Sequence, residues 1–240
     1  LNMQTNFLKS NFEFNIRTNH LLENAMALFF ASYFFNNKEY YKISKNILID
    51  ELSDQILDDG GHCELSPMYH QHILSRILDC YNLAKNNKNI FNDDFISILK
   101  DKSESMLGWI LKMTFNNGDI PLVNDSAFNI YPTTAELINY SKKLSLESIS
   151  VPLSSSGYRK INKENYECVI DIGKIGPDYM PGHSHSDTFN FILYYKNSPF
   201  IVDTGISTYD NCSRRQIERS TSSHNTIKNQ LSTLNPPWGN

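Results

Sequence analysis

The sequence lacks the cysteine spacing of a disulfide scaffold, a redox motif or a cysteine-rich metal site. Its four cysteines stand far apart among 240 residues, at positions 63, 80, 168 and 212. Four cysteines are too few to crosslink a chain of this length, and none of them forms a Cys-x-x-Cys pair. The fold must therefore depend on apolar burial, for which a hydrophobic fraction of 40% is sufficient.

An excess of positive charge and long apolar runs are also missing. Lysine and arginine number 22 against 26 aspartates and glutamates, so the net charge is −4. No global positive field is available to bind nucleic acid or an anionic membrane surface. No run reaches the roughly 18 apolar residues of a membrane span, and residues 1–10 lack the apolar core of a secretion signal. Composition therefore predicts neither a nucleic-acid partner nor a membrane span, and it leaves the oligomeric state open.

Helical periodicity fills the chain from about residue 19 to residue 140. Residues 21–35 are apolar on nearly every face, and residues 40–56 carry one apolar face that ends before Gly60. Ser66 and Pro67 form a preferred helix start, and residues 95–115 form a fourth helix. Short connections between successive helices predict stacked antiparallel hairpins.

The pattern changes to strands after a serine-rich linker at residues 143–157. Strands are predicted at residues 167–172, 188–195 and 199–203, with a turn at Asn197. The middle strand has one apolar side that could pack against a second sheet. The sequence thus predicts a multidomain protein in which a helical part precedes a β part.

Two polar clusters stand at predicted helix starts. The first, residues 17–24 (Arg-Thr-Asn-His-Leu-Leu-Glu-Asn), precedes the apolar run of the first helix. One interpretation is a capping assembly in which Thr18 or Asn19 accepts hydrogen bonds from free N–H groups. The second, residues 60–72, contains three histidines and Tyr69 at a helix start, where the helix field favours the anionic form of a phenol. Both clusters are candidates for binding or catalysis.

A third polar group lies at the ends of predicted strands. Residues 182–187 (Gly-His-Ser-His-Ser-Asp) precede one strand, residues 201–205 (Ile-Val-Asp-Thr-Gly) end the next, and His224 follows. Two imidazoles and one carboxylate suit Zn²⁺ and leave a fourth position open. They could equally hold an acidic sugar. A zinc hydrolase with Asp187 as its base is therefore one alternative on these residues alone.

Taken in order, the motifs at residues 19–24, 60–70, 182–187, 201–205 and 220–226 resemble the heparinase II/III family of polysaccharide lyases. The resemblance spans nearly the whole chain. It implies an (α/α) toroid of helical hairpins followed by an antiparallel β-sandwich, with the active site between them. We then expect a fragment of a longer protein, with the C-terminal part of the toroid in residues 1–145 and the start of the sandwich in residues 146–240.

The resemblance also implies the reaction. Family members cleave acidic polysaccharides such as heparan sulfate or alginate by β-elimination, which leaves a 4,5-unsaturated uronate. The uronate carboxylate must be neutralised before the C5 proton is removed and O4 is protonated. Asn19 and His20 match the neutralising positions, with His183 assisting, and either histidine could be the base. Tyr69 matches the tyrosine that acts as acid or base, and Tyr209 lies where alginate-cleaving members carry a second one.

Further roles follow from the same resemblance and, for Arg214 and Arg219, from the local positive charge that an anionic ligand needs. Glu23, His62, Arg214 and Arg219 are expected to contact substrate, and Glu23 is expected to orient His20. A metal site is implied at His185, Asp203 and His224. Its ion is expected to be structural Zn²⁺, with Ca²⁺ as an alternative, because β-elimination needs no metal-bound hydroxide.

Two further expectations concern function and location. A family member that binds an acidic polysaccharide without cleaving it, or that takes part in polysaccharide biosynthesis, is the alternative to a lyase. The presence of Asn19, Tyr69 and His183 argues for the lyase. Because the substrates of the family lie outside the cytoplasm, a periplasmic or secreted location is expected.

Overall fold

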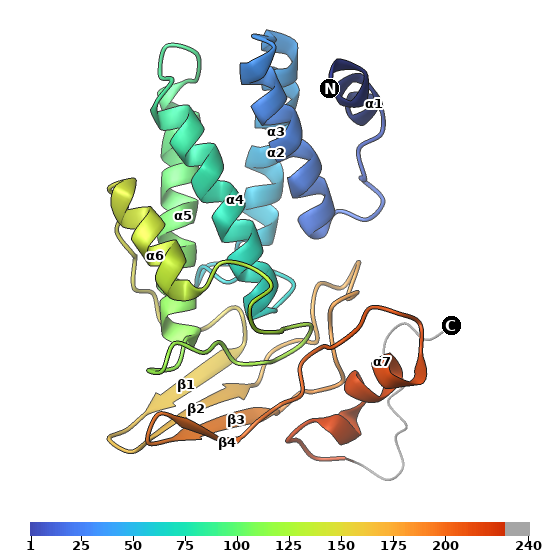
Figure 1. Cartoon of the computed structure of the whole chain (residues 1–240), viewed down its shortest axis with the longest axis vertical. Coiled ribbons are helices and arrows are strands. Elements are labelled where there is room, and N and C mark those ends of the chain that lie inside the picture. The colour runs from blue at the N-terminus through green and yellow to red at the C-terminus, as the bar shows by residue number, and fades with distance from the viewer. Residues whose placement is uncertain (229–240) are drawn as a thin grey trace.

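A computed structural model describes residues 1–228 of the chain, so the end of the predicted second domain, residues 229–240, lies outside the described residues. The first part is helical (Figure 1), as predicted. Its helices are α1 (Asn2–Ser10), α2 (Thr18–Phe34), α3 (Lys38–Gln55), α4 (Pro67–Lys85), α5 (Asp93–Met113) and α6 (Thr134–Lys143). The helices α1 and α6 were not predicted, whereas the other four were.

Side-chain caps fix the helix starts. Asn37 accepts hydrogen bonds from two backbone N–H groups at the start of α3. Ser66 accepts from the N–H of Tyr69 at 3.2 Å, and Pro67 occupies the first turn of α4, as predicted. Thr133 and Glu136 form a capping box at α6. The cap at Ser66 matters most for the site, because it fixes Tyr69 in the first turn of α4.

One core joins the helices to the sheet. The helix α2 packs against α3, and α4 packs against α5. The buried cluster continues from these helices into the strands through Tyr158, Val169 and Ile192. Phe115, just after α5, stacks on Tyr194 of the sheet with ring centroids 3.9 Å apart. Burial of these aromatic side chains holds the helical and β parts together.

The β part contains one antiparallel sheet of strands β1 (Tyr158–Asn162), β2 (Tyr166–Asp171), β3 (Phe191–Tyr195) and β4 (Ser198–Ile201), paired in chain order. It lies below the helices in Figure 1. The strand β1 was not predicted. Within residues 1–228 there is a single sheet, so the second layer of the expected sandwich is not among the described residues.

The predicted strand at 188–195 begins only at Phe191. Phe189 has a φ of 68°, which is incompatible with an extended strand, and its side chain is 60% exposed. Asn190 turns its amide onto the carboxylate of Asp203 at 2.7 Å. The residues before β3 are therefore a loop, and the polar motif at 182–187 belongs to that loop.

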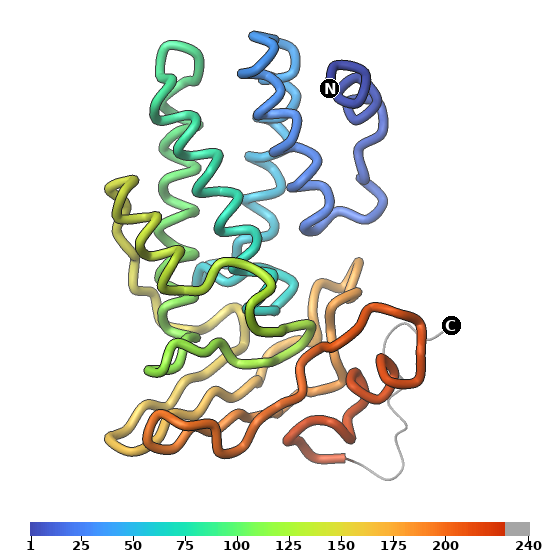
Figure 2. Tube along the Cα trace, in the orientation of Figure 1, coloured from blue at the N-terminus to red at the C-terminus, as the bar shows by residue number. Residues whose placement is uncertain are grey.

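Long loops extend from the sheet toward the starts of α2 and α4 (Figure 2). They include residues 172–190 and residues 202–212, followed by α7 (Ser213–Glu218) and the short η1 (Thr221–Ser223). None of the helices within residues 1–228 has the length and apolar character needed to cross a membrane.

Candidate active site

Tyr69, His183 and Tyr209 meet where α4 faces the loops of the sheet. The hydroxyls of Tyr69 and Tyr209 lie 2.9 Å apart. The ring of His183 stacks on that of Tyr69, with centroids 3.9 Å apart. These three predicted catalytic residues come from three segments distant in the sequence, and the structure brings them together.

The two tyrosines are held in their protonated forms. Burial raises the pKa of Tyr69 from 10.0 to about 12. Burial also raises the pKa of Tyr209, and its hydrogen bond with Tyr69 adds to this effect. Both phenols therefore carry their protons near neutral pH, so each is suited to donate a proton. The helix-start field expected to favour a phenolate at Tyr69 is outweighed by burial.

Asp125 organises the site and was not identified from the sequence. Its carboxylate is fully buried and lies 2.9 Å from Nδ1 of His183 and 2.8 Å from Nε2 of His185. Both guanidinium Nη atoms of Arg215 also donate to it, Nη2 at 2.7 Å. The guanidinium of Arg215 in turn lies 5.3 Å from the ring centroid of Tyr209. Asp125 thus connects the helical part of the chain to two loops of the β part.

The ionised state of Asp125 determines which nitrogen of each neighbouring histidine carries a proton. Burial alone would raise its pKa, but the hydrogen bonds from His183, His185 and Arg215 outweigh burial and hold the pKa well below the usual range. An ionised carboxylate only accepts hydrogen bonds. His183 therefore donates through Nδ1 and His185 through Nε2. In the neutral form of each ring, the other nitrogen keeps its lone pair.

Local backbone contacts hold Asp125 in place. Its carbonyl oxygen accepts from the hydroxyl of the α4 cap, Ser66, at 2.7 Å, and its N–H donates to the carbonyl of His183 at 3.0 Å. Gly205 passes so close to Ser126 that an added Cβ would lie 2.1 Å from the Ser126 carbonyl oxygen. A side chain at this glycine would push away the loop that carries Tyr209. The only sequence signal for Asp125 is the polar run Asn-Asp-Ser within an apolar segment.

Glu64 lies between the His183 loop and the start of α2. Its Oε1 lies 3.8 Å from Nε2 of His183. Burial raises the pKa of Glu64, and the nearby His183, Thr18 and His20 oppose this shift. The oxygen of the Asn19 side chain accepts from the Thr18 hydroxyl at 3.3 Å. His20 is thus near Glu64, which in turn faces His183, whereas Asn19 is linked here only to Thr18.

The expectation that Glu23 orients His20 is wrong. His20 instead faces Glu13, with Nδ1 and Oε1 3.5 Å apart. The carboxylate of Glu23 lies 3.1 Å from Nε2 of His72 and 3.4 Å from Nε of Arg76, both on α4. Residue 23 is one helical turn beyond residue 20, but this face of α2 is turned toward α4.

Of three residues predicted to contact substrate, two are buried and one is exposed. His62 is fully buried, and its Nε2 lies 3.0 Å from Oε1 of Gln55. The guanidinium of Arg219 is also buried, where it donates two hydrogen bonds to the carbonyl of Ser184. In this structure these two side chains support the loops and are out of reach of a polymer. The side chain of Arg214 is 70% exposed, so it alone of the three faces solvent.

Buried histidines make the fold sensitive to acid. Burial lowers the pKa of His62 and of His70 from 6.5 to about 3. Because the folded pKa lies below the unfolded one, stability is fully present above about pH 6.5 and is lost as the pH falls toward 3. We expect the free energy of unfolding to fall by about 2 kcal/mol per histidine between pH 7 and pH 5, measured by urea denaturation. The His20→Gln variant, which lacks a half-exposed histidine, is the control, and its free energy of unfolding should fall between pH 7 and pH 5 by as much as that of the wild type. A wild-type protein that is as stable at pH 5 as at pH 7 would contradict the prediction.

The donors at the predicted metal site suit zinc in type. His224 Nδ1 lies 2.8 Å from Oδ2 of Asp203, and the rings of His185 and His224 have centroids 5.2 Å apart. His185 Nδ1 and His224 Nε2 are buried and have no hydrogen-bond partner among the described residues. Buried, unpartnered imidazole nitrogens are the atoms that bind Zn²⁺. Residues 1–228 nevertheless contain no group of three His, Cys, Asp or Glu side chains at ligand spacing.

Asp187, the base of the hydrolase alternative, is 1% exposed. Burial raises its pKa from 3.8 to about 7, and the neighbouring Asp171 adds to the shift. Because the side chain is buried, a substrate has no access to it. The geometry therefore disfavours the hydrolase.

Two family profiles match the chain, one over the helical part and one over the β part. The family profile described as heparinase II/III N-terminus matches residues 1–145, and that described as heparinase II/III-like, C-terminal, matches residues 147–230. The chain belongs to the heparinase II/III family.

Individual relatives agree with this assignment. A heparin-sulfate lyase of Bacteroides stercoris is 23% identical over 242 residues, which cover 89% of this chain and 36% of the relative. A crystal structure of heparinase III matches with a TM-score of 0.78 and 22% identity over 98% of this chain and 42% of the other. A heparan sulfate lyase from Pedobacter heparinus matches with a TM-score of 0.67 and 21% identity, covering 94% and 39% of the two chains. The chain thus spans about two fifths of the length of these relatives, and the structural matches confirm the predicted order of helices before sheet.

Proposed function

We propose that this protein is a polysaccharide lyase that cleaves a uronate-containing glycosaminoglycan by β-elimination and leaves a 4,5-unsaturated uronate. The observation that carries the proposal is the contact of Tyr69 with both Tyr209 and His183, at 2.9 Å between hydroxyls and 3.9 Å between ring centroids. Membership of the heparinase II/III family and the name of the B. stercoris relative support it. Substrates of this kind lie outside the cytoplasm, so we also propose a periplasmic or secreted location.

Each step of the elimination has a candidate group. Tyr69, protonated at neutral pH, donates its proton to O4 of the leaving sugar. His183 holds its Nδ1 proton against Asp125, which leaves Nε2 free to take the C5 proton in the neutral ring. Asn19 and His20, at the start of α2, neutralise the uronate carboxylate so that the C5 proton becomes acidic. After elimination the proton that His183 took from C5 passes to the phenolate of Tyr69, which restores both groups, while the hydroxyl of Tyr209 lies within hydrogen-bond distance of the Tyr69 oxygen.

The function is tested by the absorbance of the conjugated double bond that elimination creates. We expect absorbance in the near ultraviolet to rise when the purified protein is incubated with a glycosaminoglycan, and alginate provides a second uronate polymer of different chemistry. A polymer that binds without any rise in absorbance would favour a protein that binds polysaccharide without cleaving it. Hydrolysis without a double bond would contradict the lyase.

We propose that His185, Asp203 and His224 hold one Zn²⁺ ion. When bound, this ion would fix the loop before β3 to the segment after η1, and no step of the elimination passes through it. We expect about one zinc per chain by mass spectrometry of protein purified without chelators, and His224→Ala to lose that zinc. His20→Gln is the control that keeps the metal. Protein that retains calcium or no metal after equilibration with zinc would contradict this proposal.

A further inference from the structure

The backbone at the start of α2 is strained. Arg17 and Thr18, the two residues before Asn19, have φ values of 59° and 47°, in the left-handed region that glycine favours. Thr18 is β-branched, and for such a side chain this region is a steric outlier. Arg17 is also the N-cap residue of α2, and it makes no side-chain cap hydrogen bond within the described part of the chain. A strained backbone persists only where surrounding contacts hold it, so contacts from other elements must fix this turn.

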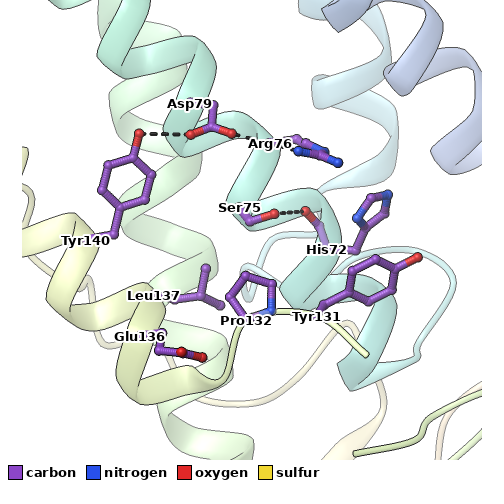
Figure 3. A pocket seen from close by; sticks show the side chains of 9 residues that line it. All are labelled: His72, Ser75, Arg76, Asp79, Tyr131, Pro132, Glu136, Leu137 and Tyr140. Atoms are coloured by element: carbon purple, nitrogen blue, oxygen red, sulfur yellow. Dashed lines mark hydrogen bonds and ion pairs between the residues drawn. The ribbon is translucent and has the colours of Figure 1, made fainter. Parts of the chain in front are cut away.

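The next turn of α2 is anchored to α4. The carboxylate of Glu23 lies 3.1 Å from Nε2 of His72 and 3.4 Å from Nε of Arg76. Figure 3 shows these two side chains on α4, where they also line a cavity. Residue 23 is one turn beyond residue 19, so this contact fixes the body of the helix. The side chains of Asn19 and His20, in the first turn, depend in addition on the strained turn that precedes them.

Two contacts from α3 hold the strained turn. The side-chain amide of Gln55 donates to the carbonyl oxygen of Thr18 at 2.9 Å. The guanidinium of Arg17 donates to the carboxylates of Glu51 at 2.9 Å and Asp54 at 2.8 Å. Thr18 and Gln55 are both buried, so their hydrogen bond is shielded from water. The conformation of the turn is therefore set by the last turn of α3.

Every polar atom of the Gln55 amide is in use. Its second N–H donates to Oε2 of Glu51 at 2.7 Å, so both amide hydrogens are committed. Its Oε1 lies 3.0 Å from Nε2 of His62 and can only accept, so His62 donates through Nε2. Burial lowers the pKa of His62 from 6.5 to about 3, so the ring is neutral and carries only this one N–H. His62 and Glu51 therefore leave the amide a single orientation, the one in which it reaches Thr18.

His62 connects the two polar clusters of the helical part. It lies in the loop that leads into α4 and Tyr69, and its ring is fully buried. A buried ring cannot contact a polymer, but its hydrogen bond supports Gln55. Contacts from His62 through Gln55 to Thr18 thus join the cluster that contains Tyr69 to the cluster that contains Asn19.

We propose that Gln55 is a positioning residue for the elimination. Its amide, oriented by its two side-chain partners, holds the left-handed turn at residues 17–18 so that Asn19 and His20 face the uronate carboxylate. Because it is fully buried, Gln55 acts without touching the substrate. The proposal rests on the proposed function, since the turn matters to turnover only if Asn19 and His20 neutralise that carboxylate.

The first test removes the amide and nearly keeps the volume. With heparan sulfate as substrate, we expect Gln55→Met to lower kcat about tenfold to a hundredfold and to change KM less than about threefold. The loss falls on kcat because the carboxylate must be neutralised most strongly in the transition state. Gln71→Met is the matched control with unchanged kcat, because Gln71 is also buried but its amide donates to Thr134 of α6 at 3.3 Å.

The second test asks whether Gln55 acts through the turn. Glycine adopts a positive φ without steric cost, so Thr18→Gly makes the turn accessible without the amide. We expect the fold-loss in kcat caused by Gln55→Met to be at least about threefold smaller in the Thr18→Gly background than in the wild type. A glutamine that merely fills the core would cost the same in both backgrounds, and that result would overturn the proposal.

Hydrogen exchange measures the turn without any substrate. The N–H of Leu21 donates to the carbonyl of Arg17 at 3.2 Å, so its protection reports whether the turn is in place. We expect this amide to exchange about tenfold faster in Gln55→Met and at the wild-type rate in Gln71→Met. If Gln55→Met does not fold, Gln55→Asn takes its place. Asparagine keeps a buried amide but is one methylene too short to reach all three partners, so the same losses are expected.

The outcomes separate the two proposals. If the wild type forms no unsaturated product from any glycosaminoglycan, the lyase proposal fails, and hydrogen exchange alone decides whether Gln55 holds the turn. If the wild type cleaves and Gln55→Met keeps kcat within about twofold, the positioning role is wrong and the lyase stands. Faster exchange without a loss of kcat would also overturn the positioning role, because turnover would then not depend on the turn.

Discussion

Replacing Tyr69 by phenylalanine is expected to lower kcat for elimination by about 10²–10⁴-fold. The change removes the single proton donor that touches both Tyr209 and His183 and leaves the ring that stacks on His183. The loss should appear in kcat rather than in KM, because the hydroxyl acts on the leaving oxygen in the transition state. It is measured by the initial rate of ultraviolet absorbance with a glycosaminoglycan that the wild type cleaves.

Tyr81→Phe is the matched control. Tyr81 is a buried tyrosine on the same helix, and its hydroxyl makes no hydrogen bond to the described residues. Its variant should retain wild-type activity. A Tyr69→Phe rate within tenfold of the wild-type rate would contradict the assignment of Tyr69 as the acid. Tyr209 would then be the candidate for that role.

Replacing Asp125 by asparagine is expected to lower the free energy of unfolding by about 3–5 kcal/mol. The carboxylate is fully buried and bound to Arg215, His183 and His185. Without its charge, the guanidinium of Arg215, which is 7% exposed as a residue, is left without compensation. Chemical denaturation of the two proteins at pH 7 measures the difference. Activity should fall as well, because an asparagine amide has one oxygen acceptor where the carboxylate has two and cannot accept from His183, His185 and Arg215 together.

Asp178→Asn controls for the loss of a carboxylate. The side chain of Asp178 is 91% exposed and lies 4.0 Å from Lys174, so its removal should change stability by less than about 0.5 kcal/mol. An Asp125→Asn protein within 1 kcal/mol of the wild type would show that Arg215 finds solvent or another partner. In that case Asp125 would not be the group that holds the two loops to the helices.

The contribution of Asp125 to the free energy of unfolding also depends on pH. Its folded pKa lies below that of an unfolded aspartate. The stabilisation is therefore complete above about pH 4, the unfolded value, and is lost as the pH falls below it toward the folded pKa. The loss due to His62 and His70 begins at about pH 6.5, so between that pH and about pH 4 it is measured without a contribution from Asp125.

The predictable parts of the fold were those with local signals. Ser66 and Pro67 marked the start of α4, and the alternation of apolar residues located the sheet. The loop at 188–190 was missed because Phe189 reads as a strand residue although its φ is positive. The helix α1 was missed because it is only nine residues long and buries only Thr5.

The candidate site was predictable only where motifs carried a family resemblance. The contact of Tyr69, His183 and Tyr209 agrees with that prediction, although their catalytic roles remain predictions. Asp125 has no motif, and its importance depends on three partners that approach from distant parts of the chain. Glu23 was given the wrong partner because sequence spacing places it near His20, whereas the packing of α2 on α4 decides what it faces.

The hydroxyl contact between Tyr69 and Tyr209 joins residues 140 positions apart in the sequence, and the pair of Asp125 with Arg215 spans 90. Contacts of such separation form late, because the entropy of closing the intervening chain must be overcome first. The helices can therefore gain their native content while the reaction centre is still unassembled. During refolding, circular dichroism therefore measures the formation of the helices. Catalytic activity measures the later step in which the loops that carry His183 and Tyr209 pack against Tyr69.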